Sequence, residues 1–231
     1  MNNNLKSWIA SHSFAMTEKG FTLAEVLVTL GIIGVVSAMT VPTLMQNHQR
    51  KTYVTQLHKV YNELNQCLFR YQNDRNAVNL TEAGVTSTAA LQNVITTYMK
   101  VVSTCDSVAA PCFANNYKYI SGTKVGSGAY ISSAKSFVLA SGAAIRPLYD
   151  KPSTFKIANF MIDINGQQGP NVAGRDLFFL YLYSNGVIDD GPDTAAYNAP
   201  LTKAQREALN CEETLNGCFG RLLNDNWEMN Y

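Results

Sequence analysis

The sequence predicts an α+β fold in which a long N-terminal helix packs on a four-stranded antiparallel sheet. A nearly continuous apolar run at residues 21–45 is followed by apolar positions at helical spacing as far as residue 72. Four short segments rich in β-branched and aromatic residues lie in the second half of the chain. At 231 residues, the chain has room for one medium domain and one additional element.

The apolar run is long enough to cross a bilayer as a helix of about 25 residues. Glu25 is its only ionisable residue. The preceding residues 1–20 are mostly polar, contain Lys6 and Lys19, and have no apolar core of the kind found in secretory signal peptides. The sequence therefore predicts one membrane-embedded segment at 21–45, preceded by a short polar extension.

Glu25 is the anomaly in this segment. A carboxylate inside a membrane helix costs up to ~3 kcal/mol, and less near the interface. It therefore either lies at the level of the lipid headgroups, or has a partner or a function. The residues around it favour a function.

Residues 19–25 read KGFTLAE, and the apolar residues 26–34 and Pro42 follow. Together they resemble the processing and assembly signature of type IV prepilins and type II secretion pseudopilins. The resemblance implies that a membrane-bound prepilin peptidase cuts after Gly20 and methylates the new N-terminus, Phe21. Residues 1–20 are then the leader peptide, 21–45 the transmembrane and assembly helix, and 46–231 a pilin-like globular domain.

The same resemblance gives Glu25 an assembly role that has its own physical logic. The ammonium group on Phe21 of one subunit and the Glu25 carboxylate of a neighbour neutralise each other inside an apolar helix bundle, where an unpaired charge is costly. Pro42 is expected to kink or locally open the helix, because it lacks an N–H and clashes with the preceding turn.

The expected partners are copies of this chain or other pilins and pseudopilins, the prepilin peptidase, an inner-membrane assembly platform and membrane lipid. The expected location is the bacterial inner membrane, in a single pass, with the N-terminus cytoplasmic and the globular domain periplasmic or extracellular, and then the filament. A rival interpretation is an ordinary secretory signal cleaved after Ala38, which the polar extension and Glu25 oppose.

Beyond the apolar run, the spacing predicts that the helix continues over residues 47–72, and that a second, shorter helix contains apolar positions from Leu91 to Val102. Strands are predicted at 136–140, 144–149, 155–164 and 177–183. Pro147 predicts an edge position for its strand, because proline cannot donate to the ladder. The C-terminal aromatics, Trp227 and Tyr231, are expected to dock on the sheet.

Four of the five cysteines form two pairs, each with six intervening residues. Cys105 with Cys112, and Cys211 with Cys218, are therefore candidate disulfides in an oxidising compartment. The spacing is wider than that of zinc knuckles, although zinc stays an alternative. Cys67 is the odd cysteine, and its place on the apolar stripe favours a buried free thiol over an intermolecular bridge.

The segment between the last two predicted strands concentrates oxygen-bearing side chains with glycines. Asp163, Asn165, Asn171 and Asp176 are candidate calcium ligands, since calcium takes six to eight oxygens. The EF-hand pattern is absent, and the same residue types also build ordinary rigid turns. No other cofactor is expected.

No enzyme is expected. The three histidines (His12, His48, His58) lie in the leader or the long helix, and the adjacent acids Asp189 and Asp190 should point apart. With Lys+Arg 18 against Asp+Glu 17, charge gives no indication of nucleic acid as a partner. The expected function is a structural subunit of a type II secretion pseudopilus. The alternatives are a type IV pilin for adhesion, motility or DNA uptake, and a membrane-anchored calcium-dependent binding module.

Overall fold

The computed structural model describes residues 20–106, 110–126, 134–150, 155–192 and 197–231. The chain divides into two compact units, Met1–Gln46 and Asn47–Tyr231. His12 and the two lysines of the polar extension lie outside the described residues.

The predicted long helix is confirmed as α1, which spans Leu23–Asp74 without a break and contains Pro42. From residue 47 onward, one face of α1 is buried, as the apolar spacing predicts. That face consists of Val54, Leu57, Val60, Leu64, Cys67, Leu68 and Tyr71. The second helix, α2 (Thr88–Tyr98), begins at Ser87, whose side chain accepts a hydrogen bond from the Ala90 N–H.

The sheet has six strands, not the four that the sequence predicts, in the order β1-β2-β3-β4-β5-β6 and with every pair antiparallel. The four predicted strands correspond to β2 (Ser136–Leu139), β3 (Ala144–Tyr149), β4 (Lys156–Asp163) and β5 (Leu177–Tyr183). The two additional strands are at the edges: β1 (Val101–Cys105) and β6 (Ile188–Asp189).

The prediction for Val102 is wrong, because α2 ends at Tyr98 and Val102 lies in β1. The apolar spacing of α2 extends to Val102 by chance. The strand that contains Val102 is too short to show a clear alternating pattern of its own. The edge position predicted for β3 is also wrong, because β3 lies between β2 and β4. Pro147 is tolerated there because β2 pairs only with Ala144 and Ile145, so that Pro147 has a neighbour on the β4 side alone.

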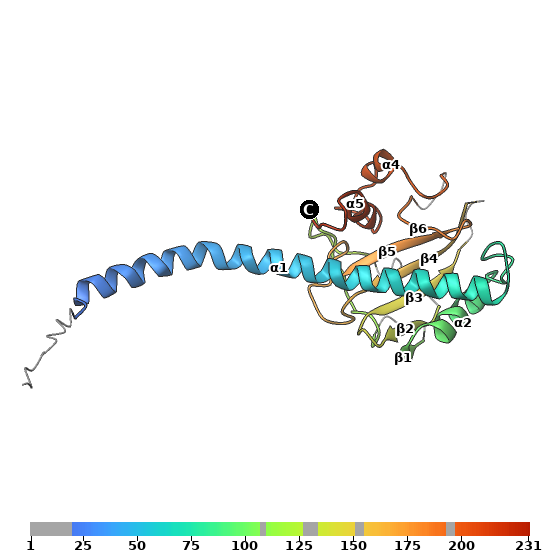
Figure 1. Ribbon diagram of the computed structural model, residues 1–231, viewed down its shortest axis with the longest axis horizontal. Helices are drawn as coiled ribbons and strands as arrows, with labels where there is room; N and C mark the ends of the chain where they lie inside the picture. The colour runs from blue at the N-terminus through green and yellow to red at the C-terminus, as the bar shows by residue number, and fades with distance from the viewer. Residues whose placement is uncertain (1–19, 107–109, 127–133, 151–154, 193–196) are drawn as a thin grey trace, which may run out of the picture. The chain divides into compact units, whose positions relative to one another are not determined.

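Both faces of the sheet are covered. Leu57 and Leu64 of α1 and Ile95 of α2 form one core with Phe160 and Leu180 of the sheet. Figure 1 shows α1 crossing this face of the sheet. The opposite face packs under residues 112–125, where Phe113 and Tyr117 contact the cluster that contains Met161. Because side chains alternate along a strand, Phe160 lies in the core on the α1 side and Met161 in the core on the opposite side. Every residue of β4 is therefore buried.

Two short helices follow the sheet, α4 (Lys203–Glu207) and α5 (Cys218–Asn224). The C-terminal segment after α5 returns to α1. The ring of Trp227 stacks on that of His58, with centroids 4.0 Å apart, and also contacts Tyr61 and Phe219. Both C-terminal aromatics, Trp227 and Tyr231, pack against the core that α1, the sheet and α5 form together.

Candidate processing and assembly site

The residues of the prepilin-like signature lie at the start of α1. Thr22 and Glu25 form a reciprocal cap there. The Thr22 N–H and hydroxyl donate to Oε2 of Glu25 at 2.8 and 2.9 Å, and the Glu25 N–H donates to the Thr22 hydroxyl at 3.2 Å. The Glu25 carboxylate also lies in the first turn, where the helix dipole favours a negative charge.

Sequence reasoning missed Thr22, although the signal was present. A threonine followed three residues later by a glutamate, just before an apolar run, is the pattern of a capping box. The charge of Glu25 in an apolar run suggested a partner in another subunit, and its cap with Thr22 at the start of the same helix was not predicted. Glu25 thus has a local role in starting α1 in addition to any role between subunits.

The cap does not neutralise Glu25. Among the described residues, no lysine, arginine or histidine forms an ion pair with this carboxylate. Hydrogen bonds from Thr22 stabilise the charge in part, but they supply no positive charge. Among the described residues the carboxylate thus has hydrogen-bond donors but no counter-ion.

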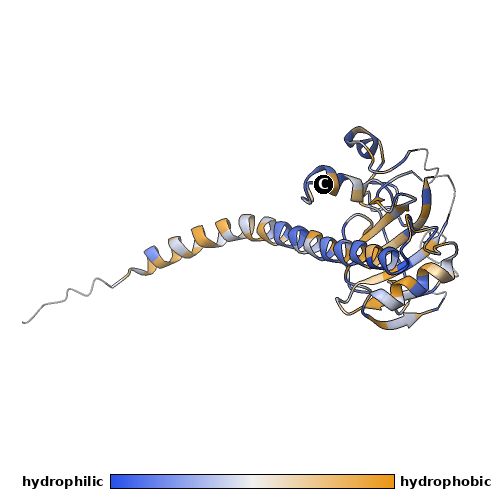
Figure 2. Ribbon diagram, turned by 45° about the vertical axis from the view of Figure 1, so that its right-hand side comes forward, coloured by the Kyte–Doolittle hydropathy of each residue, from blue (hydrophilic) through white to orange (hydrophobic). Residues whose placement is uncertain are grey.

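The side chains after Glu25 form an exposed apolar surface. Phe21 is 87% exposed, and exposed apolar side chains continue from there to Met45. Figure 2 shows this hydrophobic stretch giving way to a more hydrophilic one along α1. Exposed apolar area of this extent marks a surface that lipid or other protein covers.

Two of the threonines in the stretch hydrogen-bond within the helix. The Thr29 hydroxyl donates to the carbonyl of Glu25 at 2.9 Å, and the Thr40 hydroxyl donates to that of Val36 at 2.9 Å. A Cβ placed on Gly31 or Gly34 would meet no atom within 4 Å, so both glycines are open to close approach by another helix. Glu25 is the one ionisable residue of the stretch.

Of the described helices, α1 alone is long and apolar enough to cross a membrane, by length and composition. A long apolar N-terminal helix joined to an α+β domain fits a membrane-anchored, pilin-like protein. Residues 15–41 match the family model for the prokaryotic N-terminal methylation motif, the prepilin-type signature. The chain carries the signature that Gly20, Phe21 and Glu25 predicted. Comparison with curated proteins and with solved structures finds no match.

The four candidate calcium ligands are used to build turns. Asp163 accepts hydrogen bonds from the Tyr117 hydroxyl at 2.6 Å and from the Asn165 N–H at 3.1 Å. Asp176 accepts from the N–H groups of Asn171 at 2.6 Å and Val172 at 2.7 Å. Since N–H and O–H donors point at these oxygens, the geometry favours a rigid turn over a calcium site. The calcium interpretation stays a hypothesis.

Two further observations bear on this loop. The Oδ1 atoms of Asn165 and Asn171 are buried and have no hydrogen-bond partner among the described residues, and these are the oxygens that a cation would use. However, the described residues contain no group of three or more histidine, cysteine, aspartate or glutamate side chains able to hold a metal ion. The loop glycine Gly174 has a packing explanation, because a side chain there would overlap Cys218.

The cysteines are joined as Cys105–Cys112 and Cys211–Cys218. The first disulfide ties the end of β1 to the segment that covers the sheet, and the second closes the loop before α5. Cys67 is free and buried on α1, and burial raises the pKa of its thiol to about 12.

The acids Asp189 and Asp190 point to different partners, as their adjacency predicts, but both are buried. Arg206 binds Asp189 through two hydrogen bonds of 2.9 and 2.7 Å. Asp190 accepts from the backbone N–H groups of Gly217 and Gly220 at 2.8 and 2.7 Å. The pair therefore anchors the two C-terminal helices to β6, a structural role that gives no support for paired acid–base chemistry.

Proposed function

We propose that this chain is a structural subunit of a filament, processed at Gly20 and assembled through α1, and that it is not an enzyme. One observation carries the proposal. Glu25 is an acid without a counter-ion among the described residues, placed at the start of an exposed apolar helix and inside a prepilin-type signature. Cleavage after Gly20 would create the missing cation on Phe21.

A pairing between subunits follows from the charges. The methylated ammonium of Phe21 in one subunit lies against the Glu25 carboxylate of the next, and the apolar surfaces from residue 21 to 45 cover one another. An unpaired charge inside such a bundle would cost several kcal/mol, so the pair also fixes the register between subunits. Gly31 and Gly34 allow the helices to approach each other.

The experiment separates the charge of Glu25 from its capping role. Glu25→Gln keeps an oxygen that accepts from Thr22 and removes the charge, whereas Glu25→Ala removes both. We expect both variants to enter the membrane and neither to be incorporated into filaments. Glu63→Ala, a change of a partly exposed acid that pairs with Lys59 further along α1, is the control and should assemble normally. Normal assembly of Glu25→Gln would refute the charge-pairing role.

Within this class, we propose a pseudopilin of a type II secretion apparatus, with the globular domain in the periplasm. The alternative is a type IV pilin of the cell surface. A deletion strain distinguishes them, because loss of protein secretion supports the first and loss of surface fibres, adhesion, motility or DNA uptake supports the second. Neighbouring genes for a secretion ATPase and an outer-membrane channel, or for a retraction ATPase, give the same distinction.

A further inference from the structure

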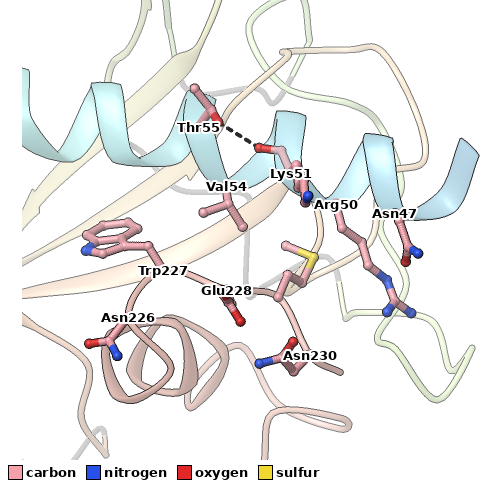
Figure 3. A pocket seen from close by; sticks show the side chains of 10 residues that line it. Asn47, Arg50, Lys51, Val54, Thr55, Asn226, Trp227, Glu228 and Asn230 are labelled. Carbon is pink, nitrogen blue, oxygen red and sulfur yellow. Dashed lines mark hydrogen bonds between the residues drawn. The ribbon is translucent and has the colours of Figure 1, made fainter. Parts of the chain in front are cut away.

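A groove opens between α1 and the C-terminal segment, within the unit that begins at Asn47. Its volume is about 540 Å³. Asn47, Arg50 and Lys51 line one wall, and the other wall includes Trp227, Glu228 and Asn230. Figure 3 shows the side chains of the two walls around the opening. The volume is in the range of small-molecule sites.

The first wall carries an excess of positive charge. Neither Arg50 nor Lys51 forms an ion pair with any described acid. Arg50 also lies close enough to Arg175 to lower the pKa of that guanidinium, second to the effect of burial. The wall that Arg50 and Lys51 line is therefore positively charged without a described counter-ion, which favours binding of an anion.

These cations have a defined place in the sequence. Arg50 and Lys51 are the first lysine or arginine after Lys19, and they follow the last apolar residue of the membrane segment, Met45, by five and six residues. Basic and aromatic side chains at such positions lie at the level of lipid headgroups. The anion that is most abundant at this level is the phosphate of a phospholipid.

The second wall adds a carboxylate and a rigid frame. Glu228 is exposed and has no ion-pair partner among the described residues. Its neighbour Trp227 is fixed by stacking on His58 and by a 2.7 Å hydrogen bond from its N–H to the carbonyl of Leu222. The groove thus presents two cations on one wall and one anion on the other, and the backbone beside Glu228 is held in place by the contacts of Trp227.

We propose that this groove binds the zwitterionic phosphoethanolamine headgroup of a membrane phospholipid. Arg50 and Lys51 bind the phosphate, and Glu228 accepts hydrogen bonds from the ammonium group. The amides of Asn47 and Asn230 supply further polar contacts at the rim. The proposal concerns the single chain in the membrane, so it stands or falls independently of filament assembly.

The test measures lipid binding to the full-length chain in an uncharged detergent by native mass spectrometry. The probes are dioleoyl phosphatidylethanolamine, dioleoyl phosphatidylglycerol, which lacks the ammonium, dioleoylglycerol, which lacks the phosphate, and inorganic phosphate. We expect saturable binding in the order phosphatidylethanolamine, phosphatidylglycerol, dioleoylglycerol. Inorganic phosphate at the same concentration should compete poorly.

Variants assign the two ends of the headgroup. The double variant Arg50→Gln, Lys51→Gln should weaken the binding of both phospholipids by roughly tenfold or more. This is the effect of losing a charge-assisted hydrogen bond. Glu228→Gln should weaken the binding of phosphatidylethanolamine and strengthen the binding of phosphatidylglycerol. Lys59→Gln with Arg70→Gln, which removes the same charge from exposed positions of α1 outside the groove, should change neither.

Four results would overturn the proposal. They are the absence of saturable phospholipid binding, an equal loss in the groove and control variants, an unchanged preference between the two phospholipids in Glu228→Gln, and inorganic phosphate competing as well as lipid. The last result would indicate a site for free phosphate. Melting temperatures without lipid confirm that each variant is folded, and Arg50→Lys should retain binding.

Discussion

The Oδ2 atom of Asp190 accepts a hydrogen bond from the backbone N–H of Gly217 at 2.8 Å. The same oxygen accepts from Gly220, and Oδ1 accepts from the N–H of Gly191. One buried carboxylate thus holds the start of α5 and the disulfide loop before it on the end of β6.

Asp190→Ala should lower the free energy of unfolding by roughly 2 to 3 kcal/mol, because it leaves buried N–H groups without an acceptor. Urea unfolding of the full-length chain in detergent measures the change. Asp150→Ala, at an exposed position, is the matched control and should be close to neutral. An equal effect of the two substitutions would show that the anchor contributes nothing.

Stability should fall as the pH rises toward neutrality. Burial raises the pKa of Asp163 from 3.8 to about 7, opposed by the hydrogen bond from Tyr117 and assisted by the charge of Asp176. Because the folded state then holds a proton that the unfolded state releases, the stabilisation is full below about pH 4 and is lost as the pH rises through about 7. Burial also raises the pKa of Asp190, to about 6.

Asp163→Asn should therefore flatten this pH dependence, since the amide resembles the protonated acid. Unfolding free energies of the two proteins at pH 5 and pH 8 provide the measurement. At pH 8 the variant should have a higher free energy of unfolding than the parent protein. The part of the pH dependence that comes from Asp190 should remain. A variant that keeps the full slope would assign the pH dependence to other groups.

The cysteines predict a simple labelling result. Native, unreduced protein should take up no thiol reagent, because the free Cys67 is buried and its pKa is raised to about 12. Unfolding without reductant should expose one thiol per chain, and unfolding with reductant should expose all five. Three or more thiols in the unreduced, unfolded protein would contradict the disulfides.

Calcium should have little effect on stability. The carboxylates of Asp163 and Asp176 already accept hydrogen bonds from the loop and from Tyr117. We expect the melting temperature in excess chelator to match that in millimolar calcium. A calcium-dependent increase that Asn171→Ala abolishes would instead establish a site through the unpaired amide oxygens.

The sequence predicted the parts of the fold that have a strong period. The apolar stripe of α1 and the four inner strands carry many apolar residues at regular spacing. The two edge strands did not show in the sequence, because β6 has two residues and β1 is exposed at three of its five positions. Val102 then fitted the preceding helix by spacing alone.

The candidate site was predicted from charge and order rather than from packing. A lone acid in an apolar run is visible in one sequence, and so is its place after Gly20 and Phe21. The anchor formed by Asp189 and Asp190 was not visible in the sequence. Their partners Arg206, Gly217 and Gly220 are brought to them only by the path of the chain after β6. Long-range polar contacts of this kind leave no local pattern.

The central claim is that the functional chain begins at Phe21 and offers a new cation to Glu25. Mass spectrometry of the N-terminal peptide, from protein extracted from the native membrane or filament, tests it most directly. We predict a mature chain that starts at Phe21 and carries one N-terminal methyl group, and a Gly20→Ala variant that keeps its leader. A native chain that starts at Met1, or after Ala38, would contradict the account.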